Sequence, residues 1–388
     1  MPANRSKLSQ HYFARERAWT RHECLGDLWP FGFNATFQGF GATNDQSEMA
    51  QPTNGLWGAS VEVMLNASIS WPFVLLLVTT ATALEFGLPI DCEVGRSCVI
   101  QNYVDHDPSP NARDYQCGTL TYDGHNGTDF RLPTLVAQRA GVNVLAAADG
   151  RVLRTRDGMA DISISALNAP SVANSECGNG VVISHTEDWE TQYCHLAQGN
   201  LSVKPGDQVL KGQPIGKVGL SGKTEFPHLH LTVRHRGKVV DPFAFDTAGD
   251  ACGAGESLWN SSAREHLAYR PRTILNAGFA TVPVTMESID SGEVGLALPT
   301  AEADALVAFV RAIGLKLGDV QRLSIVGPDG QAIADSTERP LDRDKAQILL
   351  FVGRKRPSLG WQTGTYRAMY RVIRDGQNLL DQSFEVSF

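Results

Sequence analysis

The stretch Ser221-Gly-Lys-Thr-Glu-Phe-Pro-His228-Leu-His230 decides the fold and the chemistry predicted for this chain. Its final His-x-His pair opens a β-rich run, so we expect both histidines on one strand. Side chains alternate between the faces of a strand, and two residues that are two positions apart can converge on one centre. Imidazole is a common zinc ligand. Solvent-facing histidines would show the same pattern, so a metal site needs further ligands.

Two upstream motifs supply such partners. The first, His125-Asn-Gly-Thr-Asp129, places an imidazole and a carboxylate close together, and its glycine allows a tight backbone. The second, Gln192-Tyr-Cys-His195-Leu, adds another histidine. Alone, the first is compatible with a polar loop and the second with a strand-end histidine that forms a structural hydrogen bond. Together with the His-x-His pair, they indicate a metal centre.

The order His-x-x-x-Asp, Tyr-x-His-Leu, His-x-His resembles that of the lysostaphin-type (M23, LytM-like) zinc metallopeptidases, which are peptidoglycan endopeptidases. The resemblance runs from about Gly118 to Phe245 and includes the Gly180–His185 strand and the Val203–Gly216 hairpin. It implies a β-sandwich-like peptidase domain that binds Zn²⁺ and acts on peptidoglycan peptides.

Carried over residue by residue, the resemblance implies distinct roles for five side chains. His125, Asp129 and His230 would be the zinc ligands, and His195 and His228 would assist catalysis beside the activated water. The chain departs from the family pattern around the His-x-His pair, where Lys223–Pro227 precedes it and Leu231-Thr232 follows. The segment Arg131–Gly141 also looks longer than the usual connection. These departures leave the ligands intact and bear on how substrate fits the groove.

The fold class predicted is all-β, with an antiparallel peptidase domain at 118–250 and an immunoglobulin-like β domain at 272–388. Turn dipeptides such as Pro205-Gly206, Arg236-Gly237 and Asp375-Gly376 favour antiparallel hairpins. The run Ala303–Ile313 fits a helical stripe or a buried strand, and we favour the strand. Residues between Phe245 and Arg270 resemble a linker. Strands are expected at Val142–Leu145, Gly150–Arg154, Gly180–Ser184, Glu190–Leu196, His228–Arg234, Ile325–Gly330, Gln347–Val352, Thr365–Ile373 and Ser383–Phe388.

The N-terminal part and the cysteines indicate export. Residues 64–83 have the apolar centre and small-residue end of a signal peptide, and the apolar run is too short for a transmembrane helix. We therefore interpret residues 1–63 as a non-native extension and 84–117 as a lead-in segment. Six of the seven cysteines follow position 90, an even number typical of disulfides in an oxidising compartment. Cys92 and Cys98 are spaced for a small loop, and the family fold would let Cys177 pair with Cys194. Six cysteines allow fifteen connectivities, so the full set of pairs stays open.

The remaining expectations concern partners and location. A net charge of −8 argues against nucleic acid or an anionic membrane as the main partner. After signal cleavage no stable membrane span is expected, and the location predicted is periplasmic or secreted. The C-terminal domain shows no ligand or nucleophile constellation, and a role in binding an envelope protein partner is a hypothesis.

Two other functions compete with the endopeptidase. One is a catalytically silent LytM-like module that activates another wall hydrolase, although such modules typically lack a ligand. The other is a biotinyl- or lipoyl-like carrier with Lys211 on its hairpin tip, which lacks the usual flanking methionines. His106, His185 and His235 are expected to have no catalytic role. Asp105–Pro108 is interpreted as a turn.

Overall fold

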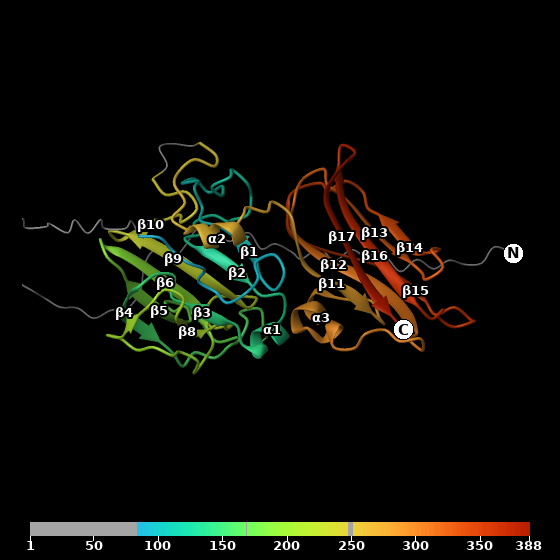
Figure 1. Cartoon of the computed structure of the whole chain (residues 1–388), viewed down its shortest axis with the longest axis horizontal. Coiled ribbons are helices and arrows are strands. Elements are labelled where there is room, and N and C mark those ends of the chain that lie inside the picture. Colours follow the sequence, from blue (N-terminus) through green and yellow to red (C-terminus); the bar gives the residue numbers. More distant parts are fainter. Residues whose placement is uncertain (1–83, 168, 247–250) are drawn as a thin grey trace, which may run out of the picture. The chain divides into compact units, whose positions relative to one another are not determined.

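One large antiparallel sheet contains all three histidine motifs (Figure 1). The computed structural model describes residues 84–167, 169–246 and 251–388. Strands far outnumber helices among these residues, and the all-β prediction is confirmed. The predicted extension at 1–63 and signal peptide at 64–83 lie outside the described residues.

The large sheet has the strand order β1-β2-β9-β6-β5-β4-β7, with β10 paired to β9. Its neighbours are antiparallel throughout, and a separate pair joins β3 to β8. The five strands predicted in this region are confirmed within one or two residues at each end. The bounds are β1 Val99–Asn102, β2 Thr128–Arg131, β3 Asn143–Leu145, β4 Gly150–Arg156, β5 Asn179–Ser184, β6 Trp189–Leu196, β7 Gln208–Val209, β8 Pro214–Lys217, β9 His228–His235 and β10 Lys238–Val240.

The two faces of this sheet differ in chemistry. Phe130, Leu229 and Leu231 are fully buried in the apolar core. Asp129 and His230, which alternate with them along β2 and β9, point to the opposite face. The period of two along the chain therefore separates the packing residues from the candidate ligands.

The C-terminal residues form two further antiparallel sheets, β11-β12-β15 and β14-β13-β16-β17, with an apolar core between them. The run that was ambiguous in sequence is strand β12, and all of its residues are buried. Burial on both faces removes the period of two, which explains the ambiguity. The immunoglobulin-like assignment stays a prediction. The strand expected at Ile325–Gly330 is wrong beyond Val326, because residues 327–330 form a turn after β13. The bounds are β11 Thr273–Ala280, β12 Ala305–Leu315, β13 Val320–Val326, β14 Ala332–Thr337, β15 Lys345–Lys355, β16 Thr365–Arg374 and β17 Gln377–Ser387.

Residues with positive φ make the tight hairpins. Arg236 and Gly237 join β9 to β10 with φ of 51° and 75°, and Asp375 and Gly376 join β16 to β17 with φ of 50° and 78°. Two consecutive positive φ values define the turn that matches the right-handed twist of paired strands. Both hairpins were expected from their Arg-Gly and Asp-Gly dipeptides.

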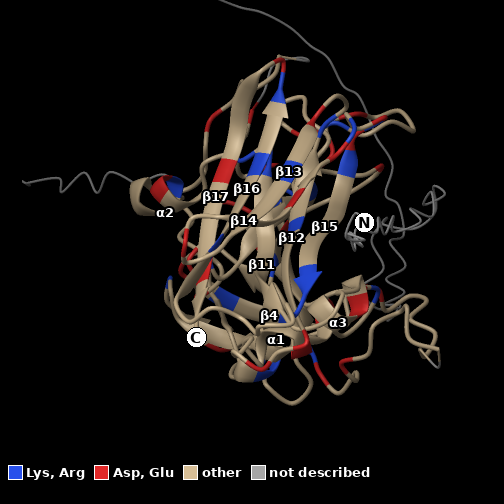
Figure 2. Cartoon of the chain, turned by 90° about the vertical axis from the view of Figure 1, so that its right-hand side faces the viewer, with Lys and Arg blue, Asp and Glu red and all other residues tan. Residues whose placement is uncertain are grey.

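The outer face of the four-stranded sheet is lined by ion pairs between neighbouring strands. Figure 2 shows basic residues on β13 and β16 and acidic residues on the neighbouring strand β17. The pairs are Arg322–Asp335 at 3.0 Å, Arg367–Glu385 at 2.6 Å and Arg371–Asp381 at 2.8 Å. Such half-exposed pairs add little stability each, and they keep both signs of charge mixed along this face.

The expectation of a linker between Phe245 and Arg270 is wrong for its second half. Trp259 is 1% exposed in the same apolar core as Phe130 and Leu229, and the Phe86 backbone N–H donates to the Leu258 carbonyl. A short helix, α2 Ser261–His266, follows and is capped by the Asn260 side chain. The small polar residues of this segment suggested a linker, but its few large apolar side chains decide its packing. The other helices are α1 Leu135–Ala140, α3 Met286–Ser291 and the 3₁₀ turn η1 Glu293–Gly295.

Three disulfides join the six cysteines of the body of the chain. They are Cys92–Cys98, Cys117–Cys252 and Cys177–Cys194, which confirms the two pairings considered from the sequence. The third, Cys117–Cys252, closes a loop with a sequence separation of 135 residues. No helix among the described residues has the length and apolar character to cross a membrane.

Replacing Cys117 and Cys252 together by serine should lower the free energy of unfolding by up to about 5 kcal/mol, because the long loop is no longer closed in the unfolded chain. Both cysteines are exposed, so lost packing contributes little. Urea unfolding without reductant measures the effect. A loss below about 0.5 kcal/mol, the range of ordinary surface substitutions, would contradict the expectation.

Candidate metal centre

Two neighbouring strands bring the predicted ligands together. In the register of β2 and β9, Asp129 lies directly opposite His230, and Arg131 lies opposite His228. Directly opposed residues have Cβ atoms only about 5 Å apart, so these side chains meet without help from a loop. His125 precedes β2 by a short Gly-containing turn and joins the same face.

The three predicted ligands form a close cluster. His230 Nδ1 lies 2.8 Å from Asp129 Oδ1, and His125 Nε2 lies 3.3 Å from both Asp129 Oδ2 and His230 Nδ1. Their ligand atoms all lie within 4.8 Å of one another, and this is the one such group of His, Cys, Asp or Glu found among the described residues. His125 and Asp129 are each 2% exposed, whereas His230 is partly exposed.

The outer nitrogen of each ligand histidine already has a hydrogen-bond acceptor. His125 Nδ1 donates to the Tyr103 carbonyl at 2.6 Å, and His230 Nε2 lies 3.1 Å from both Asn126 Oδ1 and Thr232 Oγ1. A carbonyl oxygen only accepts, so it selects the tautomer whose other nitrogen is free of a proton. Those free nitrogens face Asp129. Two imidazole nitrogens and one carboxylate, with such outer contacts, fit the donor set of a catalytic zinc site.

The two remaining predicted histidines lie beside the cluster. His228 Nε2 is 3.4 Å from Asp129 Oδ1, and its Nδ1 lies 3.0 Å from the Phe226 carbonyl. His195 Nδ1 donates to the Ser221 carbonyl at 2.8 Å, and its ring centroid lies 4.5 Å from that of His228. Both rings are therefore held at Nδ1, and Nε2 of His228 faces the Asp129 carboxylate. The structure brings together all five residues selected from the sequence.

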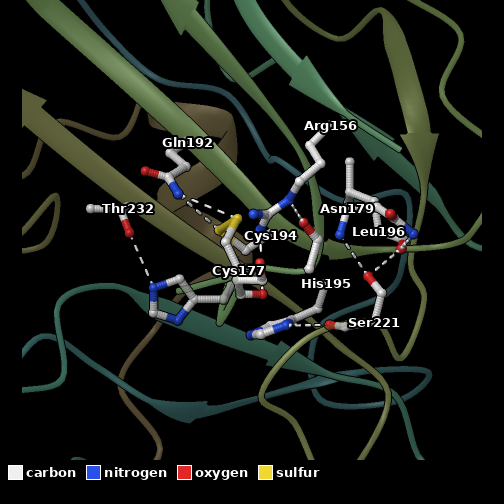
Figure 3. Close-up of a disulfide and its surroundings, with 12 residues drawn as sticks. Arg156, Cys177, Asn179, Gln192, Cys194, His195, Leu196, Ser221 and Thr232 are labelled. Atoms are coloured by element: carbon white, nitrogen blue, oxygen red, sulfur yellow. Dashed lines mark hydrogen bonds between the residues drawn. A yellow bond between two sulfur atoms is a disulfide. The ribbon is translucent and has the colours of Figure 1, made fainter. Parts of the chain in front are cut away.

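The backbone of His195 is unusual. Its φ is 62°, a left-handed conformation that is uncommon for a residue with a side chain. Two contacts hold it: the Cys177–Cys194 disulfide joins the residue before it to the start of β5, and its N–H donates to the Cys177 carbonyl at 2.8 Å (Figure 3). The disulfide thus fixes the chain at the point where β6 turns His195 towards the cluster.

The loop before the His-x-His pair is tied to the same strands. Ser221 Oγ donates to the Leu196 carbonyl at 2.7 Å and accepts the Asn179 N–H at 2.9 Å (Figure 3). Asn179 Nδ2 also donates to the Leu196 carbonyl, at 3.1 Å. These bonds position the Ser221 carbonyl that accepts the proton of His195.

Burial and mutual charge set the protonation of the cluster. Burial alone would raise the pKa of Asp129, but the imidazoles of His125 and His228 hold it well below its usual range. Burial opposes the charged form of His125, yet the Asp129 carboxylate raises the pKa of that histidine. For His195, burial and the nearby His228 and His230 hold the pKa well below its usual range, so its ring is neutral at neutral pH.

Gly127 lies where no side chain fits. A Cβ atom built on it would lie 2.5 Å from His230 Nε2 and 2.6 Å from the Leu231 carbonyl oxygen. Distances this short would force the ligand ring or the strand to move. The glycine in the motif His125-Asn-Gly-Thr-Asp129 therefore allows close approach to the second ligand, in addition to a tight turn.

The histidines that were set aside have structural contacts. His106 Nε2 lies 2.8 Å from Asp241 Oδ2, and His235 stacks on Trp189 with centroids 4.2 Å apart. The ring of His185 lies between the Asp149 carbonyl and the Thr191 hydroxyl. The predicted turn at Asp105–Pro108 is present: the Asp105 carboxylate accepts the N–H of Asp107, Arg113 and Gly124.

Sequence reasoning missed the residues around the ligands. Tyr103, Ser221 and Phe226 act through backbone carbonyls, which leave no trace in side-chain motifs. Asn102, whose side chain contacts Asp129, lies in the lead-in segment. Only the strand pairing brings it to the site.

Residues 123–242 match the model of Peptidase family M23. The match includes all five predicted site residues and confirms the family resemblance indicated by the three motifs. This part of the chain is therefore similar to the M23 peptidases.

Curated relatives are similar over the same part of the chain. Peptidoglycan DD-endopeptidase ShyA of Vibrio cholerae is 35% identical over 117 residues, which cover 30% of this chain and 22% of the relative. The cell division protein DipM of Caulobacter vibrioides is 34% identical over 108 residues, 26% of this chain and 16% of the relative. The chain thus spans about a fifth of the length of these relatives.

Solved structures also match part of this chain, with low TM-scores. A zinc containing peptidase from Vibrio cholerae is 28% identical, covers 40% of this chain and 39% of that chain, and has a TM-score of 0.27. The catalytic domain of lysostaphin from Staphylococcus simulans is 21% identical over 36% of this chain and 85% of that chain, with a TM-score of 0.24. Both TM-scores are low, so the family assignment rests on the sequence match.

The variant His195→Gln should weaken the pH dependence of stability in metal-free protein. A histidine whose folded pKa is depressed binds fewer protons when folded, so the free energy of unfolding falls as pH drops below about 6.5. Glutamine removes this contribution, and the loss of stability between neutral and mildly acidic pH should shrink. Urea unfolding in the presence of chelator measures the free energy of unfolding at neutral and at mildly acidic pH. An unchanged difference between them would contradict the depressed pKa.

The variant Gly127→Ala should lower metal affinity by at least about tenfold, because the added methyl group displaces the His230 ring. Competition with a chromogenic chelator measures the dissociation constant. Gly295→Ala is the matched control, since a Cβ there meets nothing within 4 Å. Equal affinities for the two variants would show that the ring tolerates the methyl group.

Proposed function

We propose that this chain is a zinc metallo-endopeptidase that hydrolyses peptide bonds in the cross-links or stems of bacterial peptidoglycan. One observation supports it most. The buried Asp129 carboxylate lies between one ring nitrogen of His125 and one of His230, and the other nitrogen of each ring forms a hydrogen bond that points away from the carboxylate. That arrangement suits a divalent cation and has no evident use in packing.

In this proposal His125 Nε2, one oxygen of Asp129 and His230 Nδ1 hold the ion. Zinc with three protein ligands and an open position acts as a Lewis acid and makes water a nucleophile near neutral pH. With a divalent ion bound, the one carboxylate would offset only part of its charge and the two neutral imidazoles would offset none. Net positive charge would then remain to polarise a substrate carbonyl. The apolar core beneath the sheet keeps the ligand-bearing strands rigid.

His195 and His228 provide proton transfer in this scheme. Because the Nδ1–H of His195 donates to the Ser221 carbonyl, this ring can accept a proton only at Nε2. Its depressed pKa keeps the ring neutral before the reaction. His228 is held in the same way at the Phe226 carbonyl. One ring would take the proton of the attacking water and the other would orient it, and a protonated ring would return the proton to the leaving amine.

The substrate class and location also belong to the proposal. The relative ShyA is described as a peptidoglycan DD-endopeptidase, and the M23 match covers the region with the site. Three disulfides are typical of an oxidising compartment, which supports a periplasmic or secreted protein.

A catalytically silent LytM-like module is the second candidate. The similarity to DipM, described as a cell division protein, favours it. Against it, all three ligands are present and are oriented by outer hydrogen bonds. A module without catalysis has no need to keep such contacts, so the enzyme is the better supported reading.

Purified protein starting at Leu84 should contain about one zinc ion per chain and release peptides from purified peptidoglycan. The variant His230→Ala should lose both properties, because one ligand is missing. His235→Ala is the matched control: it lies on the same strand but stacks on Trp189. Metal analysis and chromatography of released peptides provide the readouts.

Zinc without release of peptides would favour the silent module. Absence of zinc from the unmodified protein would remove the metal centre and with it the enzyme proposal.

A further inference from the structure

Strand β1 is the edge strand of the large sheet and lies before the part of the chain that matches the family. Its last residue, Asn102, pairs with Asp129 in the strand register. The Asn102 side chain reaches the predicted ligand directly, since Nδ2 donates to Asp129 Oδ2 at 2.9 Å. A residue outside the matched region thus contacts the centre of the site.

A β-bulge makes this contact possible. Val99 pairs with Arg131 and Ile100 with Phe130, so regular pairing would place Gln101 opposite Asp129. The register instead shifts between Ile100 and Asn102. Bulges redirect side chains, and this one brings the shorter carboxamide of Asn102 to the carboxylate. Gln101 accepts a hydrogen bond from Arg131 at 2.5 Å instead.

The two oxygens of Asp129 have different surroundings. Oδ1 faces His230 Nδ1 at 2.8 Å and His228 Nε2 at 3.4 Å. Oδ2 faces His125 Nε2 at 3.3 Å and Asn102 Nδ2 at 2.9 Å. His125 Nε2 and His230 Nδ1 would exchange their contacts with the carboxylate for the cation if they bind one. The amide proton of Asn102 stays, because a carboxamide nitrogen is neither a metal ligand nor an acid at ordinary pH.

The residues after Asn102 hold the other upstream ligand. The Tyr103 carbonyl accepts the proton of His125 Nδ1, and the Asp105 N–H donates to the His125 carbonyl at 2.8 Å. The Asp105 carboxylate also accepts the Gly124 N–H at 2.9 Å. The lead-in segment therefore contacts both His125 and Asp129.

We propose that Asn102 is a positioning residue for the metal centre: its amide fixes the orientation of the Asp129 carboxylate and thereby sets the affinity for zinc. The inference rests on the proposed function insofar as it requires a metal at this site. It goes further in assigning part of the metal affinity to a strand that the family match does not include. Outer hydrogen bonds to metal ligands typically contribute a factor of 10–100 in affinity.

A purely structural role is the alternative, in which the hydrogen bond only attaches β1 to β2. The chain contains a matched case of such a bond. Asn143 Nδ2 donates to Asp91 Oδ2 at 3.2 Å, and Asn143 is also a partly buried residue on a strand of the same domain. It has no contact with the ligands, so Asn143→Ala reports what losing an Asn–Asp hydrogen bond does by itself.

The test compares Asn102→Ala and Asn102→Leu with Asn143→Ala and unmodified protein. Leucine keeps nearly the size of asparagine without a donor, so it guards against a cavity or collapse in the alanine variant. The zinc dissociation constant is measured by competition with a chromogenic chelator, and urea unfolding of the metal-free proteins is measured in parallel. Both Asn102 variants should bind zinc about 10–100-fold more weakly, while Asn143→Ala retains the unmodified affinity.

Zinc affinity within about twofold of the unmodified protein, in whichever Asn102 variant unfolds cooperatively, would overturn the proposal. An equal loss in Asn143→Ala would also overturn it, because the effect would then be a general one on stability. Peptide release by unmodified protein is recorded separately. If unmodified protein binds zinc but releases no peptides, the endopeptidase is refuted, and the role of Asn102 is still decided by the zinc affinities. If it binds zinc and releases peptides but the Asn102 variants keep the unmodified zinc affinity, only the role of Asn102 is refuted.

Discussion

The site depends on one buried carboxylate. Asp129 is 2% exposed, and an ionised carboxylate at such a position is strongly unfavourable unless it is paired and hydrogen-bonded. The surrounding imidazoles and the Asn102 amide provide that compensation, and they hold the pKa of Asp129 well below its usual range. Because the carboxylate stays charged, positive charge close to it stabilises the cluster. A divalent cation provides this charge better than protonated histidines, which repel one another.

The sheet provides the geometry and the loops provide the proton arrangement. Opposite positions on β2 and β9 place Asp129 against His230, a contact set by strand register alone. The backbone carbonyls of Tyr103, Ser221 and Phe226 then accept the outer protons of three histidines. Rigid strands thus fix where the ligands are, and irregular segments fix which nitrogen of each ring faces the centre. Neither part alone would produce a site with defined chemistry.

The contacts around the candidate site extend beyond the residues that match the family. The lead-in segment contributes β1 and the contacts to both upstream ligands, and Cys92–Cys98 closes a loop just before that strand. On the other side, Trp259 packs into the same core from a segment whose composition resembles a linker. A protein trimmed to residues 123–242 would lack these contacts. The second disulfide, Cys117–Cys252, connects the two flanking segments outside the matched region.

The amino-acid sequence by itself determined the all-β class, the main strands of the sheet that holds the site, the five clustered residues and the hairpin between β16 and β17. These features are encoded locally, by a period of two, by turn dipeptides and by motif order. Only the tertiary structure decided that Asn102 contacts Asp129, that His195 adopts a positive φ beside a disulfide, and that Trp259 is buried. The physical reason is that these contacts join residues distant in sequence, through a bulged register or a backbone carbonyl. Every residue has a backbone carbonyl, so the residue types do not show which carbonyl accepts the proton of a given histidine. Only the folded chain shows it.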